Sequence, residues 1–232
     1  MAIFSDGFES GDFTAWTSTE GTPAIVPSPV HHGTYAAQMN ASGDYLEKEI
    51  AEQTILYYRC YVRFNNLQAN NNSNRFDILD VLTASEEIAC VEAFKNKWVL
   101  EYHTGAGWFS IDWVSAPVIN TWYCVELKIV ISATVGEFTV YIDGVSRMSA
   151  TGLDSNNFGN AIRVFLAYKN NDEPLTVTFD CVVVDSSYIG PEAAGVTVKK
   201  GSNLSARMTE MLNSKMLFSI ADRFPKLVPR RF

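Results

Sequence analysis

Residues 123–131 read Tyr123-Cys124-Val125-Glu126-Leu127-Lys128-Ile129-Val130-Ile131, and this stretch decides the fold. Its odd-numbered positions are apolar, whereas Cys124, Glu126 and Lys128 occupy the alternate face. Alternation at a period of two is the pattern of a β-strand that buries one face. Most of the apolar positions are β-branched or aromatic residues, which favour strands. We therefore predict a strand here, with the rest of the body organised around it.

The same pattern recurs in six further segments, which are residues 57–64, 76–82, 98–103, 138–142, 162–168 and 176–184. Turn residues such as Asp143-Gly144 separate some of them. Residues 65–74, 152–160 and 170–174 are further turn-forming stretches, the first of them rich in Asn, and they predict loops. Short alternating strands with turns between them are typical of an all-β sandwich or barrel. The sequence shows no internal repeat.

The composition is that of a folded protein with a substantial core. The chain has 232 residues, of which 47% are hydrophobic, so a wholly disordered chain is excluded. No apolar run reaches the roughly 18 residues that a membrane-spanning helix needs. The net charge of −8 argues against nucleic acid as the partner of the whole molecule.

The charge is divided unevenly along the chain. Residues 1–195 carry 10 basic and 24 acidic side chains, a balance of −14, whereas residues 196–232 carry 8 basic and 2 acidic side chains, a balance of +6. Because the character of the sequence changes after Gly190-Pro191, we divide the chain into a β-rich domain, residues 1–190, and a basic tail, residues 191–232. An acidic domain beside a basic tail suggests pairing within one chain or between chains.

The tail is predicted to form a helix from about Asn203 to Arg223, capped by Ser202 and stopped by Pro225. Such a helix is marginal alone in water and needs a surface to lie on. Its own domain, a neighbouring subunit and an anionic membrane are the alternatives. The predicted assembly residues are the apolar stripe and the terminal arginines, namely Leu204, Met208, Met211, Leu212, Ile220, Arg230 and Arg231.

The four cysteines, Cys60, Cys90, Cys124 and Cys181, all fall in apolar strand-like segments. We expect buried free thiols, with one or two disulfides as the alternative. None lies in a C-x-x-C pair, which argues against a zinc ribbon or a thioredoxin-like site. The histidines do not form a zinc set either, because two are adjacent in sequence and the third is alone.

The N-terminal residues lack the basic and apolar regions of a secretory signal. The chain therefore stays inside the cell that makes it, leaves by lysis or in a virion, or has lost a leader.

Five phrases in order resemble concanavalin A-like (laminin G-like) jelly rolls across residues 3–190. They are Asp6-Gly7-Phe8-Glu9-Ser10-Gly11-Asp12-Phe13 with Trp16, His32-Gly33-Thr34-Tyr35-Ala36-Ala37, the pair Thr121–Leu127 and Phe138–Gly144, and Phe179-Asp180-Cys181-Val182-Val183-Val184. The resemblance implies an all-β, two-sheet antiparallel jelly-roll sandwich, here with a C-terminal helical tail. Such sandwiches include lectins, carbohydrate-binding modules, glycoside hydrolases, polysaccharide lyases and viral adhesins, so the fold leaves the function open.

Retaining glucanases of this type carry catalytic carboxylates in an E-x-D-x-x-E phrase, which is absent here. The nearest stretch holds Asp77 and Asp80. They are three residues apart, so a regular strand points them to opposite faces. A hydrolase is therefore disfavoured.

A lyase of this type needs a Tyr or His base and a cation that neutralises a uronate carboxylate. Arg59, Tyr61 and Arg63 share one strand face, and His103, with Glu101, lies on a possible neighbouring strand. These are the lyase candidates, although the alginate-lyase phrases R-x-E-L and Q-I-H are missing. The alternative is an ordinary sheet surface.

Sugar binding without catalysis needs exposed aromatic rings beside planar polar groups. The candidates are Trp108, Trp113, Tyr102, Tyr141 and Tyr168. Trp108 follows Gly105-Ala106-Gly107, a turn that favours its exposure. The alternative is that the aromatic rings fill the core, which we expect for Trp98 and Trp122.

The resemblance also implies a structural Ca²⁺ that ties the first strand to the last. The matching ligands are Glu9 with Asp6 or Asp12, and Asp180. The alternative is a set of strand-end carboxylates without an ion.

The sequence thus favours a non-catalytic, lectin-like module that binds glycan, displayed on an extracellular surface or virion and assembled as a homo-oligomer through its tail. A self-assembling structural protein without glycan binding, and a polysaccharide lyase, are the alternatives.

Overall fold

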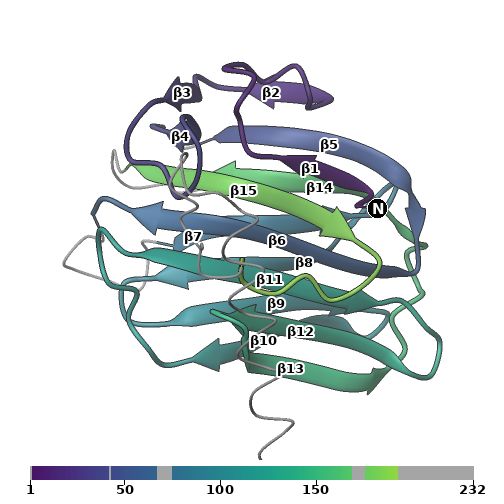
Figure 1. The fold of residues 1–232 in the computed structure, drawn as a ribbon. Coiled ribbons are helices and arrows are strands. Elements are labelled where there is room, and N and C mark those ends of the chain that lie inside the picture. The colour runs from purple at the N-terminus through teal and green to yellow at the C-terminus, as the bar shows by residue number, and fades with distance from the viewer. Residues whose placement is uncertain (1, 42, 67–74, 169–175, 193–232) are drawn as a thin grey trace, which may run out of the picture. The chain divides into compact units, whose positions relative to one another are not determined.

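The structure, a computed structural model, describes residues 2–41, 43–66, 75–168 and 176–192. Within these ranges the regular structure consists of 15 β-strands. The strands form two antiparallel sheets that face one another, as Figure 1 shows. The predicted all-β, two-sheet antiparallel jelly-roll sandwich is confirmed.

We call the eight-stranded layer sheet A and the seven-stranded layer sheet B. In spatial order, sheet A contains β13 (Val145–Leu153), β12 (Gly136–Ile142), β11 (Trp122–Val130), β6 (Ile55–Phe64), β15 (Val177–Asp185), β4 (Ala36–Met39) and β3 (Ala24–Val26), and β1 (Phe4–Asp6) pairs with β15. Sheet B contains β10 (Gly107–Trp113), β9 (Trp98–Thr104), β8 (Glu87–Phe94), β7 (Arg75–Leu82), β14 (Ala161–Tyr168), β5 (Asp44–Gln53) and β2 (Ser18–Glu20).

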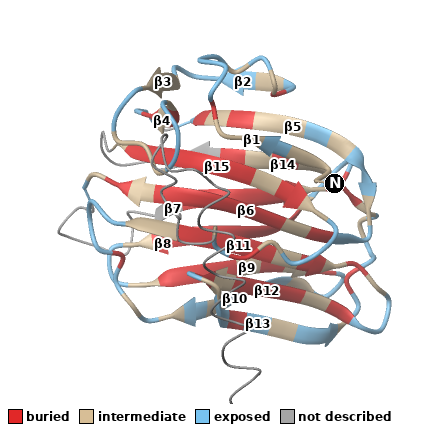
Figure 2. Cartoon of the chain, viewed as in Figure 1, coloured by how far each residue is buried: buried red, intermediate tan, exposed pale blue. Residues whose placement is uncertain are grey.

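The core lies between the sheets and is built by the alternation that the sequence shows. On β11 the side chains of Val125, Leu127 and Ile129 are fully buried. On its neighbour β6, Cys60 and Val62 are buried in the same cluster. Figure 2 shows buried residues running along the central strands of both sheets. Their apolar area removed from water is the main source of stability.

The alternating segments of the sequence do not include the short strands β1 to β4, nor the longer strands β5, β8, β10 and β13. β5 carries Glu47, Lys48, Glu49 and Glu52, which are poor strand formers. β13 is an edge strand and is largely exposed. Pairing with a neighbouring strand overrides local preference in both cases.

All four cysteines are free and buried, which confirms the expectation of buried thiols. In the described ranges, no helix is long and apolar enough to cross a membrane. The chain divides into two units, residues 1–191 and 192–232. The predicted tail helix and its assembly residues, Leu204, Met208, Met211, Leu212, Ile220, Arg230 and Arg231, lie outside the described residues.

Candidate functional site

Among the side chains of sheet B that the structure describes, the most exposed aromatic ones, Trp108 and Phe109, lie on the hairpin of β9 and β10. Its register pairs Trp108 with His103 and Phe109 with Tyr102. Because side chains alternate along a strand, the first pair lies on the outer face of sheet B and the second faces sheet A. The tight turn uses Gly107, whose φ of 120° suits glycine.

Trp108 is held on the outer face by a stack of rings. Its indole lies 4.7 Å from the His103 ring, with 10° between the planes. The other stacking partner of His103 is Phe158, at 4.3 Å. Trp108 nevertheless keeps 49% of its surface exposed. A large apolar ring that is fixed in place and half exposed is a platform for the C–H face of a ligand.

Beside this turn, where sheet B meets the segment after β13, lies a pocket with a volume of about 520 Å³. Tyr102 and Phe109 form its aromatic part, with ring centroids 5.5 Å apart. Its remaining lining residues are Thr104, Gly105, Ala106, Leu153, Asp154 and Asn157.

Planar polar groups are built into this pocket. The Asn157 amide donates to the Asp154 carbonyl and carboxylate oxygens, both at 3.2 Å. A Cβ on Gly105 would lie 2.7 Å from the Asn157 amide carbon, so only glycine allows this approach. The pocket therefore offers hydrogen-bonding groups next to aromatic surface, as sugar sites do.

The outer face of sheet B is strongly acidic next to Trp108. Glu101 lies two residues from His103 on β9 and faces the same way. Its carboxylate oxygen, a Glu92 oxygen and the Cys90 sulfur lie within 4.8 Å of one another. Burial and the surrounding carboxylates, Asp80 foremost among them, raise the pKa of the Cys90 thiol well above its usual value.

The expectation that Asp77 and Asp80 point to opposite faces is wrong. β7 contains an irregularity between Asp77 and Leu79, so Asp77 pairs with Glu92 while Asp80 pairs with Cys90. One extra residue in the strand restores both carboxylates to the outer face. Both are almost completely buried there.

The lyase candidates lie on different sheets. Arg59, Tyr61 and Arg63 are on β6 in sheet A, whose neighbours are β11 and β15. His103 is on β9 in sheet B, between β8 and β10. The expectation that His103 neighbours the β6 residues is therefore wrong, because strand order depends on connections between segments that local alternation does not reveal.

The two arginines hold loops in place. Arg59 donates to the carbonyl oxygens of Gly190 at 3.1 Å and Cys181 at 3.0 Å, and it is buried. Arg63 donates to the Asn120 side-chain oxygen at 2.7 Å. These bonds explain why basic side chains occupy the outer face of β6.

The predicted aromatic residues are dispersed. Tyr102 is 8% exposed and belongs to the core, although it also lines the pocket. Trp113 packs against the core beneath the Arg147 guanidinium, 4.6 Å from its ring. Tyr141 lies on sheet A, 5.2 Å from the Tyr188 ring. The side chain of Tyr168 lies outside the described residues.

Several residues of the pocket and its surroundings have no signal in the sequence. Phe109 follows Trp108 directly and so faces the other way, and Asn157 comes from a loop after β13. Phe158 reaches His103 from that same loop. The one local indication of this region is the glycine-rich turn before Trp108. The contacts with the loop after β13 depend on tertiary structure, which local sequence patterns do not encode.

The proposed calcium ligands are engaged by N–H donors instead of by one another. Asp6, Glu9 and Asp180 do not bring their oxygens into a cluster within 4.8 Å. The donors to them are Phe8 and Trp16 for Asp6, Thr34 and Tyr35 for Glu9, and His31, His32 and Cys181 for Asp180. Asp12 binds Ser10 and Thr14 in a turn. Calcium binding stays a prediction of the sequence, and calcium takes no part in the function proposed below.

No family model and no curated protein sequence matches the chain. Solved structures do. The endo-β-1,4-glucuronan lyase of the fungus Trichoderma reesei matches 81% of this chain and 96% of its own length, at 14% identity and a TM-score of 0.62. The cellulose-induced protein Cip1 matches over 81% and 99%, at 16% identity and a TM-score of 0.63.

The receptor-binding domain of botulinum neurotoxin type G matches 82% of this chain and 48% of that one, at 15% identity and a TM-score of 0.59. The chain has a jelly-roll sandwich fold. Sequence identities this low establish a shared fold only. They do not indicate a shared activity, because one fold supports many functions.

Proposed function

We propose that this jelly roll binds a neutral glycan at the β9–β10 edge and does not cleave it. The observation that carries the proposal is Trp108, which is half exposed yet fixed against His103. A pyranose ring would pack on the exposed surface of the indole, on the outer face of sheet B, and a glycan that continues around the β9–β10 turn would reach the pocket on the inner side. In the pocket, the Asn157 amide offers a hydrogen-bond donor and an acceptor, and the Asp154 carboxylate offers further acceptors.

The charges favour a neutral glycan over a uronate polymer. Glu101, Glu92, Asp77 and Asp80 lie on the same outer face as Trp108. The basic side chain of Arg163 on that face is paired with a carboxylate, at 3.4 Å. A uronate polymer needs cations beside its carboxylates, and these four acidic side chains are carboxyl groups, which cannot supply them.

The names of two structurally similar proteins, a glucuronan lyase and a cellulose-induced protein, support a polysaccharide as the ligand. The lyase alternative therefore stays an outcome of the test. Display of the module through its tail, on a surface or a virion, stays a prediction of the sequence.

The test measures binding of neutral β-glucan, xylan and mannan oligosaccharides by calorimetry and affinity electrophoresis. We expect Trp108→Ala to weaken binding at least about tenfold, the equivalent of 1.4 kcal/mol. Tyr188→Ala is the matched control, because Tyr188 is also 49% exposed but lies with the sheet A strands. It should leave affinity unchanged.

Binding that survives Trp108→Ala, or no binding across the neutral panel, contradicts the proposal. Incubation with glucuronan and alginate forms the second arm. Absorbance from an unsaturated product would establish a lyase in place of the binding module.

A further inference from the structure

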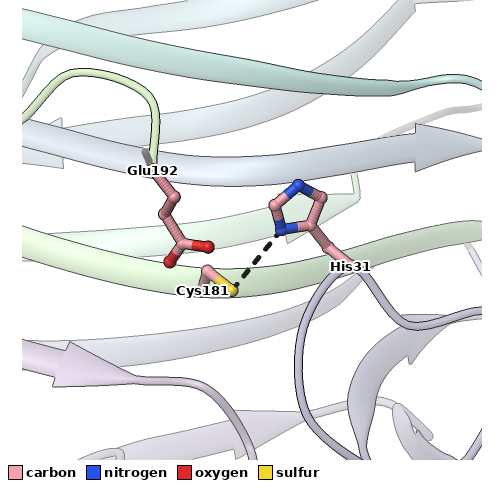
Figure 3. Close-up of side chains that lie close together, drawn as sticks. All are labelled: His31, Cys181 and Glu192. Carbon is pink, nitrogen blue, oxygen red and sulfur yellow. Dashed lines mark hydrogen bonds between the residues drawn. The ribbon is translucent and has the colours of Figure 1, made fainter. Parts of the chain in front are cut away.

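A thiol and an imidazole meet on the outer face of sheet A, away from the glycan site. Cys181 lies in β15 and His31 in the loop between β3 and β4. The Cys181 sulfur is 3.8 Å from His31 Nδ1, and Figure 3 shows the ring and the thiol facing one another. The two residues are 150 positions apart in sequence.

One carboxylate positions both backbones. Asp180 Oδ2 accepts the His31 N–H at 2.8 Å and the His32 N–H at 3.1 Å. Asp180 Oδ1 accepts the Cys181 N–H at 2.7 Å. β15 is irregular between Asp180 and Val183, and Cys181 has a φ of 50°, which is uncommon for a residue with a side chain. The bulge therefore re-aims this thiol.

Aromatic contacts orient the imidazole. The His31 ring stacks on Tyr61, with centroids 3.5 Å apart and 18° between the planes. Trp122 meets the same ring edge-on at 5.7 Å. A ring held on two sides presents its Nδ1 atom in a defined direction, which lowers the ordering cost of binding a ligand.

The spacing of the two atoms fits a shared metal ion. Zinc binds sulfur at about 2.3 Å and imidazole nitrogen at about 2.0–2.1 Å, so two such ligands on a tetrahedral ion lie roughly 3.6 Å apart. The Cys181 thiol donates to Asp180 Oδ1 at 3.4 Å, and this is the proton that a bound cation would displace.

We propose that Cys181 and His31 bind a thiophilic divalent cation of the zinc class through Sγ and Nδ1. Binding releases the thiol proton, and water or further ligands complete the coordination. This site is independent of the proposed glycan site, which lies on the β9–β10 hairpin of sheet B.

Cobalt(II) is the probe, because its bond to a thiolate gives a charge-transfer absorption band. The full chain is stripped with a chelator and titrated with Co²⁺, followed by competition with Zn²⁺. We expect one equivalent of Co²⁺ to produce the band and Zn²⁺ to abolish it. His31→Ala and Cys181→Ser should each weaken binding at least about tenfold.

The controls are close neighbours. His32→Ala removes the adjacent imidazole, and Cys124→Ser removes another thiol of the same buried cluster. Both should keep the band. A band that survives Cys181→Ser, or that disappears in Cys124→Ser, overturns the proposal. Absence of any band in the wild-type chain also overturns it and leaves a simple thiol–imidazole hydrogen bond.

A measurement on the wild-type chain covers the case in which a variant fails to fold. Alkylation of each cysteine by iodoacetamide is followed by mass spectrometry with and without Zn²⁺. We expect Zn²⁺ to slow alkylation of Cys181 at least about tenfold. An unchanged rate at Cys181 contradicts the proposal.

Discussion

Cys124 on β11 is expected to make the folded state less stable as the pH rises into the alkaline range. Burial raises the pKa of its thiol to about 12. The unfolded chain loses this proton near pH 9, so between pH 9 and 12 the folded state binds more protons. The free energy of unfolding therefore falls as pH rises, by at most about 1.4 kcal/mol per pH unit for one thiol. Below pH 9 this contribution is constant.

The measurement is urea unfolding from pH 8 to 11, for the wild type and Cys124→Ala. Cys60 and Cys90 also have raised pKa values, so the wild-type slope includes several thiols. We expect the variant to lose stability less steeply above pH 9. Equal slopes in the two proteins would contradict the role of Cys124.

In the β9–β10 hairpin, a substitution of Gly105 is expected to affect glycan binding more than folding stability. A Cβ at this position would displace the Asn157 amide, which is the movable end of a side chain. Gly105→Ala should therefore lower affinity for the neutral glycan several-fold and change the unfolding free energy by less than about 1 kcal/mol. Calorimetry and urea unfolding of the same samples check both.

Asn157→Ala provides the reference for that prediction. If displacement of the amide is the cause, adding Gly105→Ala to this variant should lower affinity no further. A further loss in the double variant would show that Gly105 acts by another route.

Strand faces follow from local sequence, whereas strand order and irregularities do not. The alternation of β6 and β11 predicts which of their side chains enter the core, because each residue's face depends only on its neighbours in sequence. The same rule fails at Asp77 and Asp80, because the irregularity in β7 arises in its pairing with β8.

The candidate site is predictable only in part for the same reason. Exposure of Trp108 follows from the glycine-rich turn before it, which is a local signal. Asn157 and Phe158 reach that turn from another loop, and His31 reaches Cys181 across 150 positions. These contacts depend on the order of the strands in the two sheets, which brings distant segments together.

For the whole molecule, the charge division is the property with the largest expected effect. Residues 1–195 carry a balance of −14 and residues 196–232 a balance of +6. Opposite charge on two parts of one chain promotes association in register, and salt weakens it, since the screening length is about 10 Å at 0.1 M. We therefore expect the full chain to form an oligomer whose mass falls as salt rises.

Removal of residues 196–232 should leave particles with the mass of one chain in light scattering at low salt. Two full-length variants then distinguish the contribution of tail charge to assembly from that of apolar contact. Arg230→Gln with Arg231→Gln lowers the tail charge, and should make the oligomer dissociate at lower salt. Met208→Ala with Met211→Ala shortens the predicted apolar stripe, and should weaken assembly at every salt concentration, because burial of apolar surface is little affected by screening. An unchanged mass after truncation would show that the basic tail does not assemble the protein.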